Sequence, residues 1–189
     1  MIIGLTGTLG AGKGAVADYL VKEKGFSHHS VREFLIQEIK RRGMPVDRDS
    51  MVIVANDLRA KQGPSYMIEQ LYEHAKQKGG DAIIESIRAP GEAEAIKKKG
   101  GVLFAVDAKQ ELRYSRIRSR ASETDDVSFE QFKQNEQREM ASEDPNRQNI
   151  SRCISMADRI ISNNGTIDDL KKEVDRILEE IKDEEGEKT

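Results

Sequence analysis

The first twenty residues, MIIGLTGTLGAGKGAVADYL, constrain the fold more than any other part of the chain. A short apolar run leads into glycines at positions 7, 10, 12 and 14 and a lysine at position 13, and a helical pattern follows. Glycine is costly in regular structure, so this density indicates a backbone that must bend sharply and approach another group closely. The segment therefore predicts a strand, a tight loop and a helix in immediate succession.

Residues 7–13 fit the first seven positions of G-x-x-x-x-G-K-[ST], the phosphate-binding loop. Such a loop aims several backbone N–H groups at one anion, and the helix N-terminus adds partial positive charge. Lys13 would then reach the β- and γ-phosphates of a nucleotide. The residues predicted to hold that nucleotide are Thr8, Leu9, Gly10, Ala11, Gly12, Lys13, Gly14 and Ala15.

Two features of this loop leave other interpretations open. Gly14 and Ala15 stand where a hydroxyl residue usually contacts Mg²⁺, so water or another side chain would have to complete the metal shell. A dinucleotide-binding loop needs G-x-G-x-x-G, and residues 10–15 fail that pattern at the last position. A tight glycine turn without a ligand is the remaining alternative.

Apolar runs alternate with helical patterns along the chain, which predicts an α/β fold with a parallel sheet flanked by helices. The runs at 82–84 and 102–106 are continuous, as in strands covered on both faces. The predicted strands are Met1–Thr6, Phe26–Ser30, Asp81–Glu85, Val102–Asp107 and Arg159–Ser162. Helices are predicted to begin near Lys13, Ser30, Asp49, Pro64, Pro90, Gln110, Ser128, Asn146 and Thr166.

Two segments stand apart from this core within what we expect to be a single domain over residues 1–189. Residues about 30–80 predict a helical insertion between the second and third strands. Residues about 112–148 are nearly all polar and predict an exposed helical flap. The expected architecture is a three-layer α/β/α P-loop NTPase with a five-stranded parallel sheet, this insertion and a lid.

Composition excludes several classes of protein. The net charge of −3 lacks the basic excess that coating nucleic acid needs, so we expect no nucleic-acid partner. No apolar run approaches the ~18–20 residues that span a bilayer, so no membrane association is expected. The single cysteine, Cys153, allows no internal disulfide and fits a reducing cytosol. We expect a cytoplasmic protein, and the sequence leaves its oligomeric state open.

The segment GTLGAGKG resembles the loop of nucleoside monophosphate kinases of the adenylate kinase type, where G-K-G-T replaces G-K-S. The similarity runs along nearly the whole chain and is greatest to dephospho-CoA kinase and its kinase-like relatives. The other similar segments are IIESIRAPGEAEAIKK, RYSRIRSR and ADRIISNNGTIDDLKKEV. The resemblance implies a P-loop kinase that uses ATP and Mg²⁺, with Asn163 and Gly165 near the adenine.

Phosphoryl transfer also fits the charged residues, because the protein must neutralise charge on three phosphate oxygens. Arginines are then expected at the acceptor and on a lid that excludes water. The arginines predicted to hold the acceptor are Arg32, Arg59 and Arg88, and those predicted to close over the transferring group are Arg116 and Arg120. Glu85 ends an apolar strand and would serve as metal ligand or base, with an ion pair to Arg88 as the alternative.

These observations predict transfer of the γ-phosphoryl group of ATP to a nucleotide-like acceptor. A nucleoside monophosphate and dephospho-CoA both match the layout. The alternative is an ATP-binding regulatory protein with weak hydrolysis and no small-molecule acceptor, because the usual hydroxyl ligand of the metal is missing.

Overall fold

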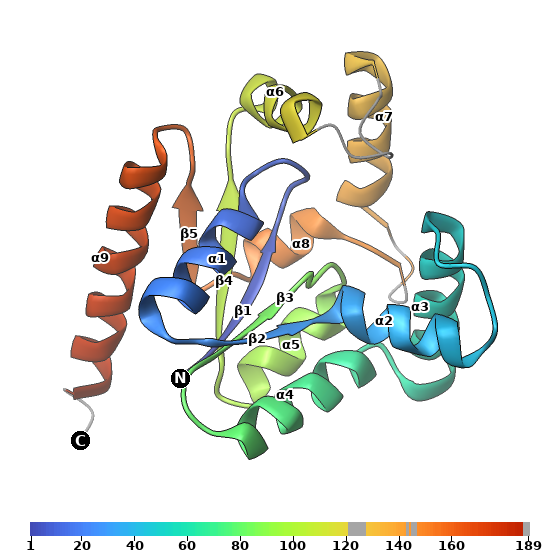
Figure 1. The fold of residues 1–189 in the computed structure, drawn as a ribbon, viewed down its shortest axis with the longest axis horizontal. Coiled ribbons are helices and arrows are strands. Elements are labelled where there is room, and N and C mark those ends of the chain that lie inside the picture. The colour runs from blue at the N-terminus through green and yellow to red at the C-terminus, as the bar shows by residue number, and fades with distance from the viewer. Residues whose placement is uncertain (121–127, 143, 145–146, 187–189) are drawn as a thin grey trace.

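A parallel sheet of five strands organises the molecule (Figure 1). The computed structural model describes residues 1–120, 128–142, 144 and 147–186, without the side chains of Arg48, Arg120 and Glu185. The strands are β1 (Ile2–Gly7), β2 (Ser27–Ser30), β3 (Ala82–Glu85), β4 (Val102–Asp107) and β5 (Arg159–Ser162). Their spatial order is β2-β3-β1-β4-β5, and every neighbouring pair runs parallel.

Helices connect the strands and cover both faces of the sheet. Over the described residues they are α1 (Lys13–Lys24), α2 (Val31–Arg41), α3 (Arg48–Gln62), α4 (Tyr66–Lys78), α5 (Pro90–Lys98), α6 (Gln110–Arg120), α7 (Phe129–Met140), α8 (Ile150–Ser155) and α9 (Ile167–Gly186). The predicted fold class is therefore confirmed. None of these described helices is long and apolar enough to cross a membrane.

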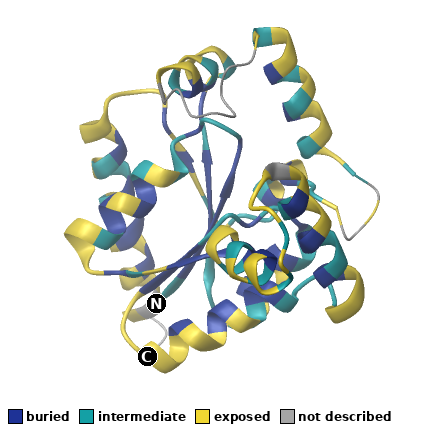
Figure 2. Ribbon diagram, turned by 45° about the vertical axis from the view of Figure 1, so that its right-hand side comes forward, coloured by how far each residue is buried: buried dark blue, intermediate teal, exposed yellow. Residues whose placement is uncertain are grey.

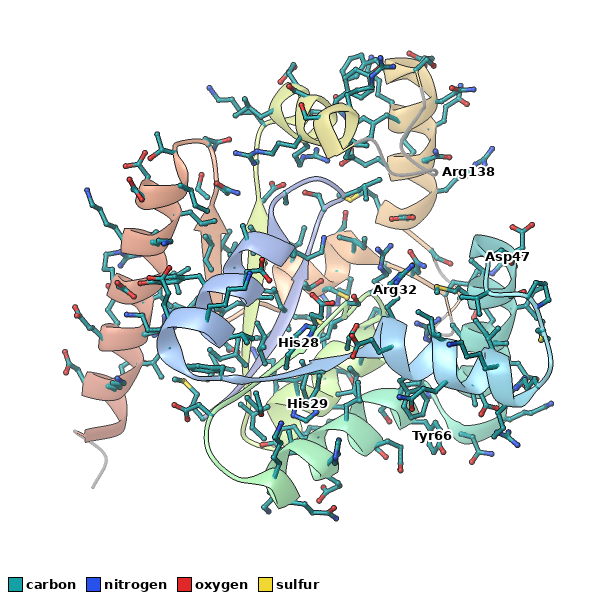
Figure 3. The ribbon with its side chains drawn as sticks, viewed as in Figure 1. His28, His29, Arg32, Asp47, Tyr66 and Arg138 are labelled. Atoms are coloured by element: carbon teal, nitrogen blue, oxygen red, sulfur yellow. The ribbon has the colours of Figure 1, made fainter. Side chains whose placement is uncertain are left out.

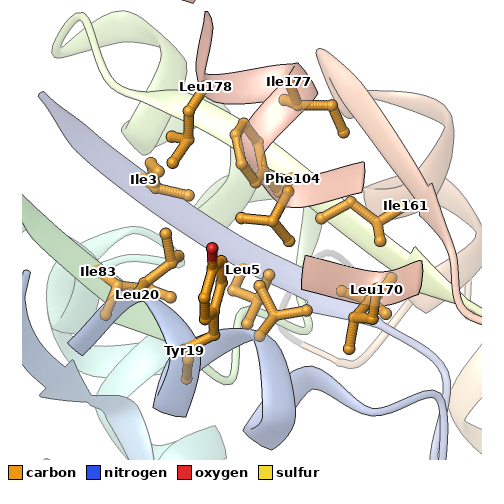
Figure 4. Packing of buried hydrophobic residues seen from close by; sticks show 14 of the residues in the cluster. Ile3, Leu5, Tyr19, Leu20, Ile83, Phe104, Ile161, Leu170, Ile177 and Leu178 are labelled. Carbon is orange, nitrogen blue, oxygen red and sulfur yellow. The ribbon is translucent and has the colours of Figure 1, made fainter. Parts of the chain in front are cut away.

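One face of the sheet packs against α1 and α9 (Figure 4). Ile3 and Leu5 of β1 and Phe104 of β4 are fully buried there. They meet Leu20 from α1 and Ile177 from α9 in the same cluster. Because β1 and β4 are central and both faces are covered, their residues are nearly all buried (Figure 2), which explains why the sequence runs are apolar without alternation.

The opposite face packs against α4, α5 and α8, and α2 and α3 extend this layer. Ile84 of β3 and Leu103 of β4 point into this second cluster and are fully buried. Helices α2, α3 and α4 together lie between β2 and β3 in sequence, as predicted for residues 30–80. We call α2–α4 the helical insertion.

The register brings the chemistry-bearing strand ends to one edge of the sheet. Gly7 at the end of β1 is paired with Val106, next to Asp107 at the end of β4. Glu85 at the end of β3 is paired with Leu5 on one side and Ser30 on the other. In parallel α/β sheets, ligands bind outside these carboxyl ends.

The polar segment 112–148 buries more than its composition indicates. Phe132 of α7 is fully buried, and its ring centroid lies 5.6 Å from that of Tyr114 on α6. Phe129 lies 5.0 Å from the same tyrosine ring, so a few aromatic residues at helical spacing hold α7 against α6. The prediction of an exposed flap was wrong for this inner face of α7, while residues 121–127, 143 and 145–146 lie outside the described part of the chain.

Candidate functional site

The loop between β1 and α1 takes a conformation that requires glycine at two positions. Gly12 precedes α1 with φ of 101°, and a Cβ there would overlap the side-chain amide of Asn163. Gly10 has φ of 78°, and a Cβ would lie 2.5 Å from the carbonyl oxygen of Arg113. Both values lie in the left-handed region that side chains disfavour. The glycines therefore let β5 and α6 approach the loop closely.

Lys13 is the first residue of α1 and folds back across the loop. Its Nζ donates hydrogen bonds to the carbonyl oxygens of Gly7 (2.8 Å) and Thr8 (2.7 Å). Burial, and after it the nearby charge of Arg88, lowers the pKa of Lys13 to about 7. The carboxylates of Glu139 and Glu85 oppose this shift. An anion in the loop would restore the ordinary preference of this amine for its charged form.

Three long-range contacts brace the loop from outside. The hydroxyl of Thr8 donates to Oδ1 of Asp107 at 2.8 Å. Nη1 of Arg113 donates to the carbonyl of Leu9 at 3.3 Å. The side-chain amide of Asn163, which is 6% exposed, donates to the carbonyl of Ala11 at 2.8 Å. These contacts fix the loop before any ligand binds, which lowers the entropic cost of binding.

A cleft of about 290 Å³ opens beside the loop and brings predicted site residues together. Arg116 of α6 holds its Nη1 3.0 Å from the carbonyl oxygen of Asn163. Cationic side chains therefore gather around a helix N-terminus, an arrangement suited to a polyphosphate. The lining residues are Leu9, Gly10, Gly12, Lys13, Gly14, Ala15, Arg88, Arg116 and Ile117.

Arg88 enters this cleft from the loop between β3 and α5. Its Nη1 lies 3.0 Å from Oε2 of Glu139 and 3.4 Å from Oε1 of Gln148. The loop begins at Ser86, whose φ of 70° is the one positive value among described residues other than glycine. Such strain persists only where the surroundings fix the backbone. The guanidinium is thus held by a carboxylate of α7 with which an anionic ligand would have to compete.

Glu85 lies half-buried at the end of β3 and is held by residues of β2. The Ser30 hydroxyl donates to Oε1 of Glu85 at 3.1 Å, and Nε2 of His28 lies 3.5 Å from the same oxygen. Figure 3 labels His28 of β2 and Arg32 of α2. The alternative expectation, an ion pair between Glu85 and Arg88, is not formed in the described part of the chain, where Arg88 pairs with Glu139.

Glu85 does not line the cleft, and four further predicted site residues lie elsewhere or outside the described part of the chain. Arg59 is 4% exposed and forms an ion pair with the fully buried Glu92, so it cannot offer its guanidinium to a ligand in this arrangement. Arg32 is exposed, and Gly165 lies in the turn before α9; neither lines the cleft. Arg120 ends α6, and its side chain lies outside the described residues.

Several residues at the site carry a weak sequence signal or none. Glu92 follows Ala89 and Pro90 at the spacing of a helix cap, which could have been read from the sequence. Glu136 and Glu139 of α7 contact Arg113 and Arg88 from a polar helix without any motif. Among the described residues, no group of three His, Cys, Asp or Glu side chains is arranged to hold a metal ion.

Comparison with known proteins identifies the family. A family model described as an AAA domain matches residues 3–144. The chain belongs to this AAA domain family. A UPF0200 protein of Pyrobaculum aerophilum is 28% identical over 184 residues, covering 96% of this chain and 98% of the relative. A UPF0200 protein of Methanothermobacter thermautotrophicus is 28% identical over 192 residues, covering 100% and 94%.

Solved structures share the fold at low sequence identity. The crystal structure of TT1252 from Thermus thermophilus has a TM-score of 0.60 at 21% identity, covering 95% of this chain and 97% of that one. Shikimate kinase from Acinetobacter baumannii in complex with shikimate has a TM-score of 0.59 at 16% identity, covering 96% and 94%. The fold of this AAA domain protein is therefore that of P-loop kinases, as the sequence resemblance implied.

Proposed function

We propose that the protein transfers the γ-phosphoryl group of ATP to a small anionic acceptor. The observation that carries this proposal is the cleft in which Lys13, Arg88 and Arg116 surround the glycine loop at the start of α1. Phosphoryl transfer depends on positioning and charge neutralisation, and these residues supply both. A nucleotide-like acceptor, either a nucleoside monophosphate or dephospho-CoA, fits the cationic side chains best.

The roles of the residues follow from their positions. Loop amides and Lys13 would bind the β- and γ-phosphates, and exchange of the Lys13 contacts to Gly7 and Thr8 would accompany binding. Arg116, which contacts Asn163, would neutralise charge on the nucleotide. Arg88, which lines the cleft, would hold the anionic group of the acceptor.

Glu85 is the residue proposed to hold Mg²⁺ or to accept the proton of the acceptor hydroxyl. Mg²⁺ is usually held by one or two carboxylates together with phosphate oxygens and water, so a cluster of three acidic side chains is not required. The Ser30 hydroxyl and His28 orient the Glu85 carboxylate from β2. When bound, the ion would supply further charge neutralisation to the phosphates.

A second candidate function follows from the residues after Lys13. Gly14 and Ala15 offer no hydroxyl to the metal, which favours an ATP-binding regulatory protein with weak hydrolysis. The two candidates differ in one measurable property. Only the kinase forms ADP in proportion to an added acceptor.

The decisive experiment is an ATP-consumption screen with Mg²⁺ against nucleoside monophosphates, dephospho-CoA and shikimate. We expect ADP formation that depends on one acceptor, and its loss in Lys13→Ala. Lys22→Ala is the matched control, since Lys22 lies on the same helix with its side chain 72% exposed. Slow ADP formation that no acceptor changes would favour the regulatory protein, and full turnover by Lys13→Ala would contradict both candidates.

A further inference from the structure

A buried ion pair joins the helical insertion to the start of α5. Nε and Nη2 of Arg59 on α3 donate to Oε1 of Glu92 at 3.0 and 2.7 Å. The side chains are 4% and 0% exposed. The remaining nitrogen, Nη1, donates to Oδ1 of Asn56 at 3.4 Å. Arg59 is thus engaged through all three guanidinium nitrogens.

The second oxygen of Glu92 holds the loop that carries Arg88. Oε2 accepts hydrogen bonds from the backbone N–H groups of Arg88 (2.9 Å) and Ala89 (3.1 Å). Glu92 is the third residue of α5, the position from which a glutamate reaches back to the residue before a helix. One carboxylate therefore connects Arg59 of the insertion to the backbone of Arg88.

Other contacts fix this loop to the sheet rather than to the insertion. The N–H of Ile87 donates to the carbonyl of Leu5 at 3.3 Å, and the hydroxyl of Thr6 donates to the carbonyl of Ile87 at 2.9 Å. The carbonyl of Arg88 accepts from the N–H of Asn149 at 2.9 Å. The loop is thus anchored on β1 and α8, and Glu92 adds the link to α3.

We propose that Arg59 and Glu92 are a positioning pair that couples the place of the helical insertion to the place of the Arg88 guanidinium in the cleft. A buried ion pair adds little net stability compared with apolar side chains of similar volume, so its value here lies in geometry. A shift of α3 would move Arg59, and with it the Glu92 carboxylate that accepts from Arg59 through Oε1. Because Oε2 of the same carboxylate accepts from the Arg88 N–H, the backbone of Arg88 would move too. The catalytic part of this inference rests on the proposed function, whereas the coupling itself does not.

Hydrogen–deuterium exchange of the full chain tests the coupling directly. In Arg59→Met, we expect the peptide covering residues 86–92 to exchange about tenfold faster, while the peptide covering β4 keeps its rate. Arg42→Met is the matched control, because it removes the ion pair at 2.7 Å between Arg42, directly after α2, and Asp57 of α3, a pair that includes no residue of the loop. Equal acceleration of both peptides, or none, would overturn the proposal.

A double variant separates positioning from stability. Arg59→Met with Glu92→Met removes both buried charges, so no uncompensated charge remains and folding is retained even where the single variant unfolds. Only this double variant also removes the carboxylate that accepts from the amides of Arg88 and Ala89, so we expect fast exchange in residues 86–92 here as well. If residues 86–92 exchanged at the wild-type rate in this variant, the pair would not position the loop, and the proposal would be overturned.

Steady-state kinetics test whether the pair also affects binding of the acceptor. With Mg²⁺, ATP and either AMP or dephospho-CoA as acceptor, we expect the double variant to raise the acceptor KM by about tenfold or more, with the KM for ATP unchanged. An equal rise in both KM values would contradict a role at Arg88. If neither acceptor is phosphorylated by the wild type, the proposed function is in question, while the exchange result still decides the coupling.

Discussion

The side-chain amide of Asn163 donates a hydrogen bond of 2.8 Å to the carbonyl of Ala11, although 152 positions separate the two residues. The carbonyl of Asn163 in turn accepts from Arg116 at 3.0 Å. Asn163 therefore ties the end of β5 to the phosphate-binding loop and to α6 at once. The closeness of this side chain also explains why position 12 is glycine.

Replacing Asn163 with alanine should loosen the loop and weaken nucleotide binding. The lost hydrogen bond leaves the Ala11 carbonyl without its partner, at a cost of about 1–2 kcal/mol. We expect the Kd for ATP to rise by about tenfold in calorimetry, with a lower melting temperature. Asn164→Ala is the control at the neighbouring position. The side chain of Asn164 accepts a hydrogen bond from the backbone N–H of Lys109 at the surface and not from the phosphate-binding loop. Equal affinities of the two variants would remove Asn163 from the site.

Adding the missing hydroxyl at position 14 should strengthen the response to metal. A Cβ at Gly14 would meet nothing within 4 Å, so Gly14→Ser fits without strain. The new hydroxyl would stand where the usual loop contacts Mg²⁺. We expect the Mg²⁺-dependent gain in ATP affinity to increase by about three- to tenfold.

Gly14→Ala separates the hydroxyl from the added volume. It carries the same Cβ without an oxygen, so its metal dependence should equal that of the wild type. The same gain in both variants would indicate that helix propensity at α1, rather than metal contact, causes the change.

Much of the fold was predictable because local signals agreed with one another. The glycine loop after an apolar run fixes β1 and α1, and continuous apolar runs identify the central strands. The last helix is predicted to begin near Thr166, and Oγ1 of Thr166 accepts from the N–H of Asp169 at 3.2 Å, while the Asp169 carboxylate accepts from the Thr166 N–H. Such signals lie within a few residues of one another and need no knowledge of the tertiary structure.

The side-chain partners of the arginines could not be predicted in the same way. Arg59 looked like an acceptor ligand, but its partner Glu92 lies 33 positions away on another helix. Arg88 meets Glu139 across 51 positions, from a segment whose composition indicated solvent exposure. Whether an arginine binds a ligand or a carboxylate of its own chain depends on packing, which a single sequence does not encode locally.

Neutralising Glu139 should free Arg88 for anions. Because Glu139 stands 3.0 Å from the guanidinium, an incoming phosphate must compete with its carboxylate. We expect Glu139→Gln to bind pyrophosphate about three- to tenfold more tightly at low salt, measured by calorimetry, with a smaller gain as salt screens the charges.

Glu130→Gln is the control for this change, since Glu130 lies on the exposed face of the same helix. It changes the net charge equally without approaching Arg88. An affinity gain of the same size in both variants would attribute the effect to long-range charge, and the contact between Glu139 and Arg88 would then be irrelevant to binding.

Binding of nucleotide should be coupled to protonation of Lys13. In the free protein its pKa is lowered to about 7, chiefly by burial and then by Arg88. Phosphate oxygens beside Nζ favour the charged amine, so the bound pKa must be higher than the free one. Below pH 7 the amine is already protonated and binding takes up no proton, whereas above pH 7 binding must take one up, and affinity therefore falls as pH rises.

At pH 8, where ordinary histidines are neutral, calorimetry in buffers of different ionisation enthalpy should give about one proton taken up per ATP, while residual binding by Lys13→Met should take up none. Affinity that stays constant from pH 7 to pH 9 would show that this amine does not meet the phosphates.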